Sequence, residues 1–287
     1  MMATSARTIG TLFVIATPIG NRDDITIRAL ETLKSVDTIL AEDTRHSMQL
    51  LTFYGIKKPL ISWHAHNEGN KAQSIITALL EGKSFALISD AGTPLISDPG
   101  YPLVNLARAH HIDVTPIPGA CAFITALSAA GVPCDAVSFF GFLPAKATAR
   151  RAKLTTLKSM PHTVIFYEST HRIQECLEDI ATVFGETCQL VLAKELTKTY
   201  ERFISGSTID VRNWLLEDLA HCKGEFVVII PPRELESVVN YSTETLTILL
   251  NELPLKQAVK LAALITGEPK NELYKTALGI GKTIPKL

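Results

Sequence analysis

Short apolar runs rich in β-branched residues alternate with segments of helical spacing from residue 12 to residue 117. The apolar runs cover residues 12–16, 38–41, 60–62, 85–89 and 114–117. The segments of helical spacing cover residues 25–35, 47–54, 71–81 and 103–110. Strands that alternate with helices pair in parallel, and the helices then cover the sheet. The pattern therefore predicts an α/β domain built on a parallel sheet.

Beyond Pro133 the order of the predicted elements changes. Helical spacing marks residues 146–159 and 172–184. Apolar runs typical of strands cover residues 137–143, 163–167, 190–193, 200–205 and 226–230. The last three runs follow one another with no predicted helix between them, which is typical of a mixed sheet. We therefore expect a second α/β domain.

Residues 117–134 carry no charged side chain and so resemble a membrane span. Pro118, Gly119, Gly131 and Pro133 confine any helix to residues 120–130. A helix of that length is too short for a bilayer, which needs about 20 apolar residues. The stretch therefore predicts a buried core helix and no contact with a membrane.

The last part of the chain has a different character. Pro231 and Pro232 end the second domain, and the polar residues 233–242 are typical of a linker. Helical spacing follows at residues 243–252, 256–265 and 270–278. The spacing places these side chains inward: Val259, Leu261, Ala262, Ile265, Leu273 and Tyr274. We expect a helix-turn-helix-like unit and three regions overall, 1–132, 133–232 and 233–287.

Composition narrows the function classes. The chain is 46% hydrophobic and 20% charged, and its formal net charge is −1, so it has no overall attraction for polyanions. Its five cysteines form no CxxC pair, which argues against disulfides and zinc and favours a reducing, cytoplasmic location. His64 and His66 alternate on an extended segment, yet no third ligand stands at suitable spacing, so we expect no metal.

Polar residues follow the predicted strands of the first domain, where ligands bind in open sheets. Thr17-Pro-Ile-Gly-Asn21 supplies a stiff turn. Asp90 stands beside the unobstructed backbone of Ala91 and Gly92, and a second carboxylate, Asp98, follows. The chain has neither GxGxxG after the first strand nor GxxxxGK[ST], so a phosphate-centred cofactor is not indicated. A ligand with hydroxyls and a cationic group suits this edge; caps and turns are the alternative interpretation.

Two further polar segments follow strands. In Ala41-Glu-Asp-Thr-Arg-His46, Asp43 or Thr44 could simply cap the next helix, or the segment could contact substrate or accept a proton. Phe166-Tyr-Glu-Ser-Thr-His-Arg172 lies where a strand becomes a helix, and the same two interpretations hold there.

Basic residues concentrate in two places. The segment 146–158 contains lysines and arginines and no acidic residue, and from Leu253 onward six lysines face two glutamates. Such density could neutralise RNA phosphates, and a solvated helix face is the alternative interpretation.

Four sequence blocks in this order, TPIGN, AEDTRH, SDAGTP and FYESTHR, closely resemble the family of ribosomal RNA small subunit methyltransferase I, within the tetrapyrrole methylase superfamily. The similarity extends through GFLPAK, LAKELTKTYE and KGEFVVII to the terminal helical unit. It implies two α/β domains with a cofactor cleft between them, and a homodimer. The implied activity is methyl transfer from S-adenosylmethionine to the ribose 2′-hydroxyl of a cytidine in the decoding region of 16S rRNA.

The resemblance also implies where the functional residues lie. Cofactor contacts are expected at Pro18, Ile19, Asp90, Ala91, Gly92, Thr93, Ala122, Phe123, Phe166, Tyr167, Leu196, Thr197, Gly224 and Glu225. For proton removal from the hydroxyl we consider Glu42, Arg45 and Lys194, and above all Asp43, His46, His171 and Glu195. RNA contacts are expected at Arg45, Lys146, Arg150, Arg151, Lys153, Arg172, Lys256 and Lys260.

Two other functions fit parts of the pattern. A tetrapyrrole C-methyltransferase would keep the cofactor and change the acceptor to a precorrin-type carbon. A non-catalytic ribosome-binding factor would use the helical unit for docking and bind no S-adenosylmethionine. The basic segments favour RNA over a porphyrin, which needs fewer and less widely spread cations.

Overall fold

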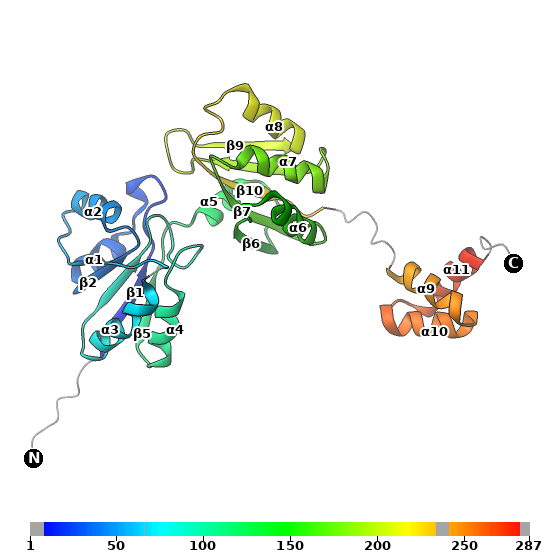
Figure 1. The fold of residues 1–287 in the computed structure, drawn as a ribbon, viewed down its shortest axis with the longest axis horizontal. Coiled ribbons are helices and arrows are strands. Elements are labelled where there is room, and N and C mark those ends of the chain that lie inside the picture. Colours follow the sequence, from blue (N-terminus) through cyan, green and yellow to red (C-terminus); the bar gives the residue numbers. More distant parts are fainter. Residues whose placement is uncertain (1–8, 66, 234–240, 282–287) are drawn as a thin grey trace, which may run out of the picture. The chain divides into compact units, whose positions relative to one another are not determined.

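In the computed structural model, which describes residues 9–65, 67–233 and 241–281, five parallel strands form the first sheet (Figure 1). Their order is β3-β2-β4-β1-β5. The strands are β1 (Thr11–Ile15), β2 (Thr38–Ala41), β3 (Leu60–Ser62), β4 (Phe85–Ile88) and β5 (Asp113–Ile117). The predicted parallel sheet is confirmed.

Helices cover both faces of this sheet. They are α1 (Ile27–Ser35), α2 (Thr44–Phe53), α3 (Glu68–Leu80) and α4 (Tyr101–Ala109), with a short 3-10 helix, η1 (Arg22–Asp24), before α1. Leu87 packs with α3 and α4, while its neighbours Ala86 and Ile88 pack with α1 and α2. Because strand β4 is buried on both sides, the polar functional residues collect beyond its carboxyl end.

The second sheet has the order β6-β7-β10-β8-β9. Its strands are β6 (Val137–Phe142), β7 (Thr163–Ser169), β8 (Gln189–Lys194), β9 (Arg202–Ser207) and β10 (Glu225–Ile230). Strand β6 pairs parallel with β7 and the other pairs are antiparallel, so the predicted mixed sheet is also confirmed.

Helices cover the second sheet on both faces as well. They are α5 (Ala122–Ala129) on one face, and α6 (Ala147–Lys158), α7 (Ile173–Phe184) and α8 (Thr208–Glu217) on the other. Helix α5 is the predicted buried helix; it lies before the expected boundary at residue 132, yet it packs against the second sheet. None of the helices in the described ranges is both long and apolar enough to cross a bilayer.

Helix α8 was missed by the sequence pattern. Its buried side chains are only Thr208, Val211 and Leu215, so the periodic apolar signal is short. Its start does carry a local signal, because Ser207 and Asp210 form a capping box.

The chain divides into two compact units, residues 1–232 and 233–287. The second unit contains α9 (Tyr241–Glu252), α10 (Leu255–Thr266) and α11 (Lys270–Gly281), and most of the predicted linker lies outside the described residues. Its core is formed by Leu246, Ala258, Val259, Ala262, Leu273 and Ala277. The prediction that Leu261, Ile265 and Tyr274 point inward was wrong: they are 39%, 62% and 40% exposed. Ala258, Val259 and Ala262 form the buried stripe of α10, so Leu261 and Ile265 lie on its outer side, and Tyr274 is partly exposed on α11.

Candidate functional site

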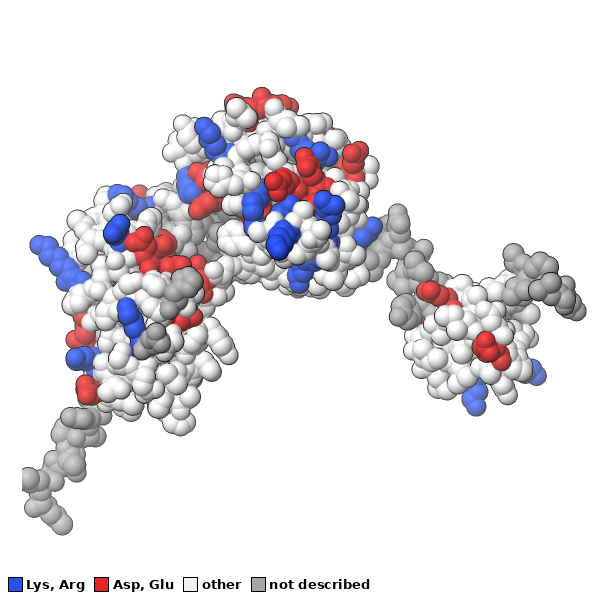
Figure 2. All heavy atoms as spheres, viewed as in Figure 1, with Lys and Arg blue, Asp and Glu red and all other residues white. Residues whose placement is uncertain are grey.

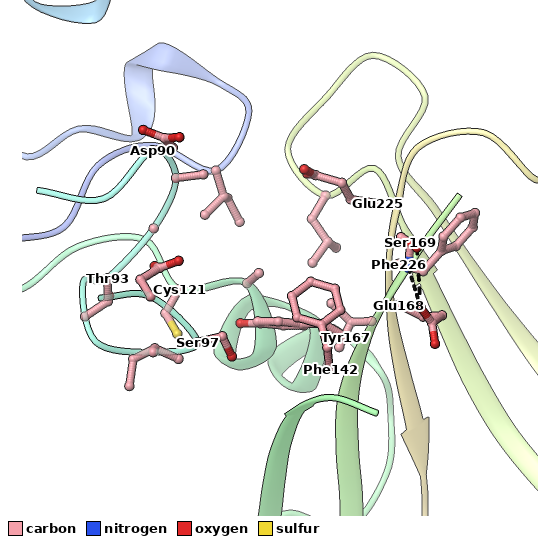
Figure 3. Close-up of a pocket in the computed structure, with 18 of the residues that line it drawn as sticks. Asp90, Thr93, Ser97, Cys121, Phe142, Tyr167, Glu168, Ser169, Glu225 and Phe226 are labelled. Carbon is pink, nitrogen blue, oxygen red and sulfur yellow. Dashed lines mark hydrogen bonds between the residues drawn. The ribbon is translucent and has the colours of Figure 1, made fainter. Parts of the chain in front are cut away.

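A cavity of about 400 Å³ lies beyond the carboxyl ends of the first sheet and against the second sheet, within residues 1–232. Figure 3 shows Asp90 and Thr93 on one side, Glu225 on the other, and Tyr167 with Phe142 below. The lining residues are Ile19, Glu42, Asp90, Ala91, Gly92, Thr93, Ile96, Ser97, Asp98, Cys121, Ala122, Phe142, Tyr167, Glu168, Ser169, Leu196, Glu225, Phe226 and Val227. Ligand pockets typically enclose about 300–1,000 Å³.

The turn after β4 is fixed by the strand next to it. The Thr17 N–H donates to the Gly92 carbonyl at 2.9 Å, and the Gly92 N–H donates to the Thr17 carbonyl at 3.1 Å. Gly92 has φ +82°, and a Cβ added there would lie 3.2 Å from Cγ2 of Ile19. The turn therefore presents bare backbone to the cavity, which a side chain would obstruct.

Carboxylates dominate the electrostatics of the cavity. Burial, together with the charge of Asp90, raises the pKa of Glu42. Burial and the charges of Glu42 and Asp90 raise the pKa of Asp98 to about 7, against the opposing effect of a hydrogen bond with Ser89. The described residues that line the cavity include no lysine, arginine or histidine. The site therefore favours a cationic ligand and disfavours a phosphate.

The loop between Thr93 and Gly100 forms one wall and is held in an unusual conformation. Leu95 and Ser97 have φ +71° and +69°, values that side-chain-bearing residues rarely adopt. The Thr93 hydroxyl donates to the Ala120 carbonyl at 3.0 Å, and the Gly100 N–H donates to Glu68 Oε2 at 3.0 Å. Both ends of the loop are thus anchored, and strain of this kind is typical of functional sites.

The same loop meets the second sheet at Gly141. A Cβ added to this glycine would lie 2.9 Å from the Ser97 Oγ. Gly141 lies where the pairing of β6 with β7 shifts register, between Phe139 and Phe142. A glycine is therefore needed here because the two α/β halves approach closely.

Aromatic side chains form the floor. The Phe123 N–H donates to the Tyr167 hydroxyl at 3.2 Å, and burial raises the pKa of that phenol. The Tyr167 ring contacts Phe139 and Phe142 edge-on. Phe142 is 56% exposed, so it offers an accessible apolar surface at the cavity.

The structure brings most of the predicted cofactor residues to the cavity. Those that line it are Ile19, Asp90, Ala91, Gly92, Thr93, Ala122, Tyr167, Leu196 and Glu225. Those that lie outside the lining are Pro18, Phe123, Phe166, Thr197 and Gly224. For the Phe166 side chain the expectation is corrected: it is fully buried in the core beneath α7, because successive residues of β7 point to opposite faces.

Of the residues considered for proton removal, all but Glu42 lie outside the lining of the cavity. Asp43 caps α2, where its Oδ1 accepts from the Arg45 and His46 N–H groups, and these bonds lower its pKa although burial opposes them. Glu195 binds Lys198 at 2.9 Å and has a lowered pKa, mainly because hydrogen bonds outweigh burial. His46 and His171 are exposed. Among all the carboxylates considered for this role from sequence, Glu42 alone is in the lining.

The predicted RNA-binding arginines include one clear error. Arg150 is 1% exposed, and its Nε donates to Asp179 Oδ2 at 2.6 Å, so the guanidinium lies in the core and does not face RNA. Arg151 contacts the same carboxylate from the surface, and Lys153 lies over the Phe140 ring. Figure 2 shows basic atoms over the region of α6 with acidic atoms beside them. Arg45, Lys146, Lys256 and Lys260 are exposed.

Arg150 and Arg172 instead hold the loop after β6. An Nη of Arg150 donates to the Ala145 carbonyl and an Nη of Arg172 donates to the Leu143 carbonyl, both at 3.2 Å. Arg172 is itself bound to the buried Glu168 at 2.7 Å. Two ion pairs therefore fix the loop that follows Phe142 at the cavity.

The site residues that sequence missed are mainly Ile96, Ser97, Asp98, Cys121 and Phe142. Asp98 gave a signal, as the second carboxylate of its segment, but its burial and its acidic neighbours arise from the tertiary fold. No metal-binding group of histidine, cysteine and carboxylate side chains occurs in the described ranges. His64 contacts Asn67, and His66 lies outside those ranges.

Comparisons with known proteins agree with this architecture. Residues 11–211 match the family of tetrapyrrole (corrin/porphyrin) methylases, and residues 243–281 match the RsmI C-terminal HTH domain. The chain is 51% identical to "Ribosomal RNA small subunit methyltransferase I" of Haemophilus influenzae over 94% of this chain and 96% of that protein. It is 50% identical to the protein of the same name from Pseudomonas aeruginosa, over 94% of this chain and 97% of that protein.

Solved structures resemble the fold at low identity. The match to a crystal structure of diphthine synthase covers 78% of this chain and 90% of that chain, with a TM-score of 0.61 and 11% sequence identity. The uroporphyrin-III-C-methyltransferase of Thermus thermophilus covers 77% and 94%, with TM-score 0.53 and 19% identity. At these identities the likeness concerns the fold alone.

Proposed function

Because the chain belongs to the ribosomal RNA small subunit methyltransferase I family, we propose that it transfers a methyl group from S-adenosylmethionine to 16S rRNA in the small ribosomal subunit. The acceptor in this proposal is the ribose 2′-hydroxyl of a cytidine in the decoding region. The observation that carries the proposal is the carboxylate-lined cavity in a chain so similar to these relatives.

The cavity suits this donor for physical reasons. S-adenosylmethionine carries a sulfonium and an ammonium group, and Glu42, Asp90 and Asp98 supply negative charge for them. The Ala91-Gly92 backbone allows close approach, while Ile19, Ala122 and Leu196 offer apolar surface for an adenine ring. Donor and acceptor must be aligned and water excluded, which two facing α/β halves can do.

Exposed basic residues support an RNA partner. Lys146 follows the loop that the buried ion pairs fix next to the cavity. Arg45 lies at the start of α2, and Lys256 and Lys260 lie on α10. We include these residues, with Arg151 and Lys153, in the proposed RNA surface. Action in the cytoplasm and a homodimeric assembly also belong to this proposal, on the basis of the family resemblance.

The test is methyl transfer from labelled S-adenosylmethionine to small ribosomal subunits that lack the modification. We expect label in 16S rRNA, and nucleoside analysis by mass spectrometry should assign it to a 2′-O-methylated cytidine. Label on the base would contradict the acceptor assignment. Label on a precorrin-type substrate alone would favour a tetrapyrrole methylase. Donor binding that is absent by calorimetry would favour a non-catalytic ribosome-binding factor.

A further inference from the structure

We propose that Asp98 receives the proton of the acceptor hydroxyl, and that binding of the cationic donor converts its side chain to the carboxylate that can do so. This inference rests on the proposed function and names a residue absent from the set expected from sequence. It assigns one role to the strained loop and to the cluster of carboxylates at the cavity.

The loop conformation places Asp98 at the cavity. Ser97, directly before it, has φ +69° and contacts the second α/β half at Gly141. Figure 3 shows Ser97 between the loop of the first half and the Tyr167 side. Ile96, Ser97 and Asp98 all line the cavity, so the loop directs consecutive residues toward the same space. Asp98 therefore lies at the cavity that the proposed donor would occupy.

The titratable groups that line the cavity with Asp98, including Glu168 of β7, come from several elements. Glu42 follows β2, Ser89 and Asp90 follow β4, and Tyr167 belongs to β7. Cys121 precedes α5, and Glu225 lines the opposite side at the start of β10. The cationic groups of the donor would counter the repulsion from Glu42 and Asp90. Burial is the largest cause of the raised pKa of Asp98, about 7 in the free cavity, and the attraction of the donor's positive charges would lower that pKa against it.

The transfer step balances with this residue as the acceptor of the proton. The hydroxyl oxygen forms a bond to the methyl carbon while the carbon–sulfur bond breaks and its electron pair stays on sulfur. The proton of the hydroxyl passes to a carboxylate oxygen of Asp98. One positive charge disappears from the donor, so the product S-adenosylhomocysteine is held less strongly by Glu42 and Asp90. Asp98 is neutral once it is protonated, so the cavity needs one cationic group fewer after the transfer than before it.

The first experiment measures protons released on binding to the full chain. Titration calorimetry at pH 7 in two buffers of different ionisation enthalpy gives this number for S-adenosylmethionine and for S-adenosylhomocysteine. We expect release of roughly half a proton for S-adenosylmethionine, because a group with a pKa near 7 is half protonated at that pH, and clearly less for S-adenosylhomocysteine. Equal release by both ligands, or none by S-adenosylmethionine, would overturn the inference.

The second experiment uses Asp98→Asn, with Asp113→Asn on the exposed start of β5 as the control. We expect Asp98→Asn to bind S-adenosylmethionine without proton release. Its single-turnover methylation rate should fall by about 10²- to 10⁴-fold, the usual contribution of proton transfer by a positioned side chain. With the donor saturating, the wild type and Asp113→Asn should lose rate only as the pH falls below neutral, through the lowered pKa of Asp98 in the donor complex, whereas the residual rate of Asp98→Asn should lack this dependence.

The outcomes separate the two proposals. An undiminished rate in Asp98→Asn would remove Asp98 from the reaction while leaving the methyltransferase assignment in place. A wild type that binds no S-adenosylmethionine, or methylates no ribosomal RNA, would instead contradict the proposed function. If Asp98→Asn does not fold, Asp98→Ser removes the same carboxylate and takes its place in both measurements.

Discussion

At the scale of single residues, the candidate site depends on backbone conformations that most side chains would disturb. Gly92 combines a positive φ with close contact to Ile19, at the turn that bridges β1 and β4. Gly131 also has a positive φ, yet a Cβ added there would meet nothing within 4 Å. An alanine at either position would strain the backbone, but only an alanine at position 92 would also contact Ile19 beside the cavity. Comparing the two substitutions therefore separates the two effects.

We predict that Gly92→Ala weakens S-adenosylmethionine binding by about tenfold or more, equivalent to about 1.4 kcal/mol. Gly131→Ala should lower the free energy of unfolding by about 1–2 kcal/mol, because alanine is strained at a positive φ, and it should keep the affinity for S-adenosylmethionine. Calorimetric titration and thermal unfolding of both variants check this. Equal dissociation constants in the two variants would show that the Gly92 turn does not contact the donor.

At the scale of elements, α6 and α7 are joined by a buried charge network. Asp179 on α7 is 3% exposed and accepts hydrogen bonds from both Arg150 and Arg151 at 2.6 Å. Arg150 also holds the Ala145 carbonyl, so the network connects the helix packing to the loop beside the cavity. The charges of residues 146–158 predicted a helix that binds phosphates. Two of these charges, Arg150 and Arg151, instead hold α6 against α7.

We predict that Asp179→Asn lowers the free energy of unfolding by about 3–5 kcal/mol, because the buried Arg150 then keeps only the exposed Glu175, at 3.4 Å, as a counter-charge. Glu178→Gln is the matched control on the same helix. Glu178 is 61% exposed and lies 3.8 Å from Arg212, so its loss should cost no more than about 1 kcal/mol. Denaturant unfolding of both full-length variants measures the difference. Similar losses in the two would contradict the role assigned to the buried network.

At the scale of the whole molecule, an acidic cavity must coexist with an RNA surface in a chain of net charge −1. Residues 241–281 of the second unit are balanced in charge, since Lys256, Lys260, Lys270 and Lys275 are matched by Glu244, Glu252, Glu268 and Glu272. Any phosphate contacts must therefore come from a small set of placed side chains and not from the overall charge.

We predict that Lys146→Gln weakens binding to the small ribosomal subunit and reduces the slope of log affinity against log salt by about 1, as expected for one lost phosphate contact. Lys34→Gln, an exposed lysine in the last turn of α1, is the control and should leave the slope unchanged. Binding measured across a salt series tests both variants. An unchanged slope in Lys146→Gln would place the RNA surface elsewhere.

Local pattern determined the main elements of this protein. Alternation of apolar runs with helical spacing predicted the parallel first sheet, the mixed second sheet and the terminal helices, because these signals lie within a few neighbouring residues. The sequence also placed the Asp90-Ala91-Gly92 turn at the functional edge, since special backbone residues follow a buried strand there. Helix α8 was missed because its buried face is too short to give a periodic signal.

Tertiary structure decided the environments of the charged side chains. Burial, together with the charges of Glu42 and Asp90 on other segments, raises the pKa of Asp98. Arg150 became a core residue through Asp179 on another helix. Burial of a charge depends on which distant elements pack around it, whereas strand and helix periodicity is written in consecutive residues. The fold therefore followed from the sequence, whereas the roles of the individual carboxylates and arginines could be assigned only from the structure.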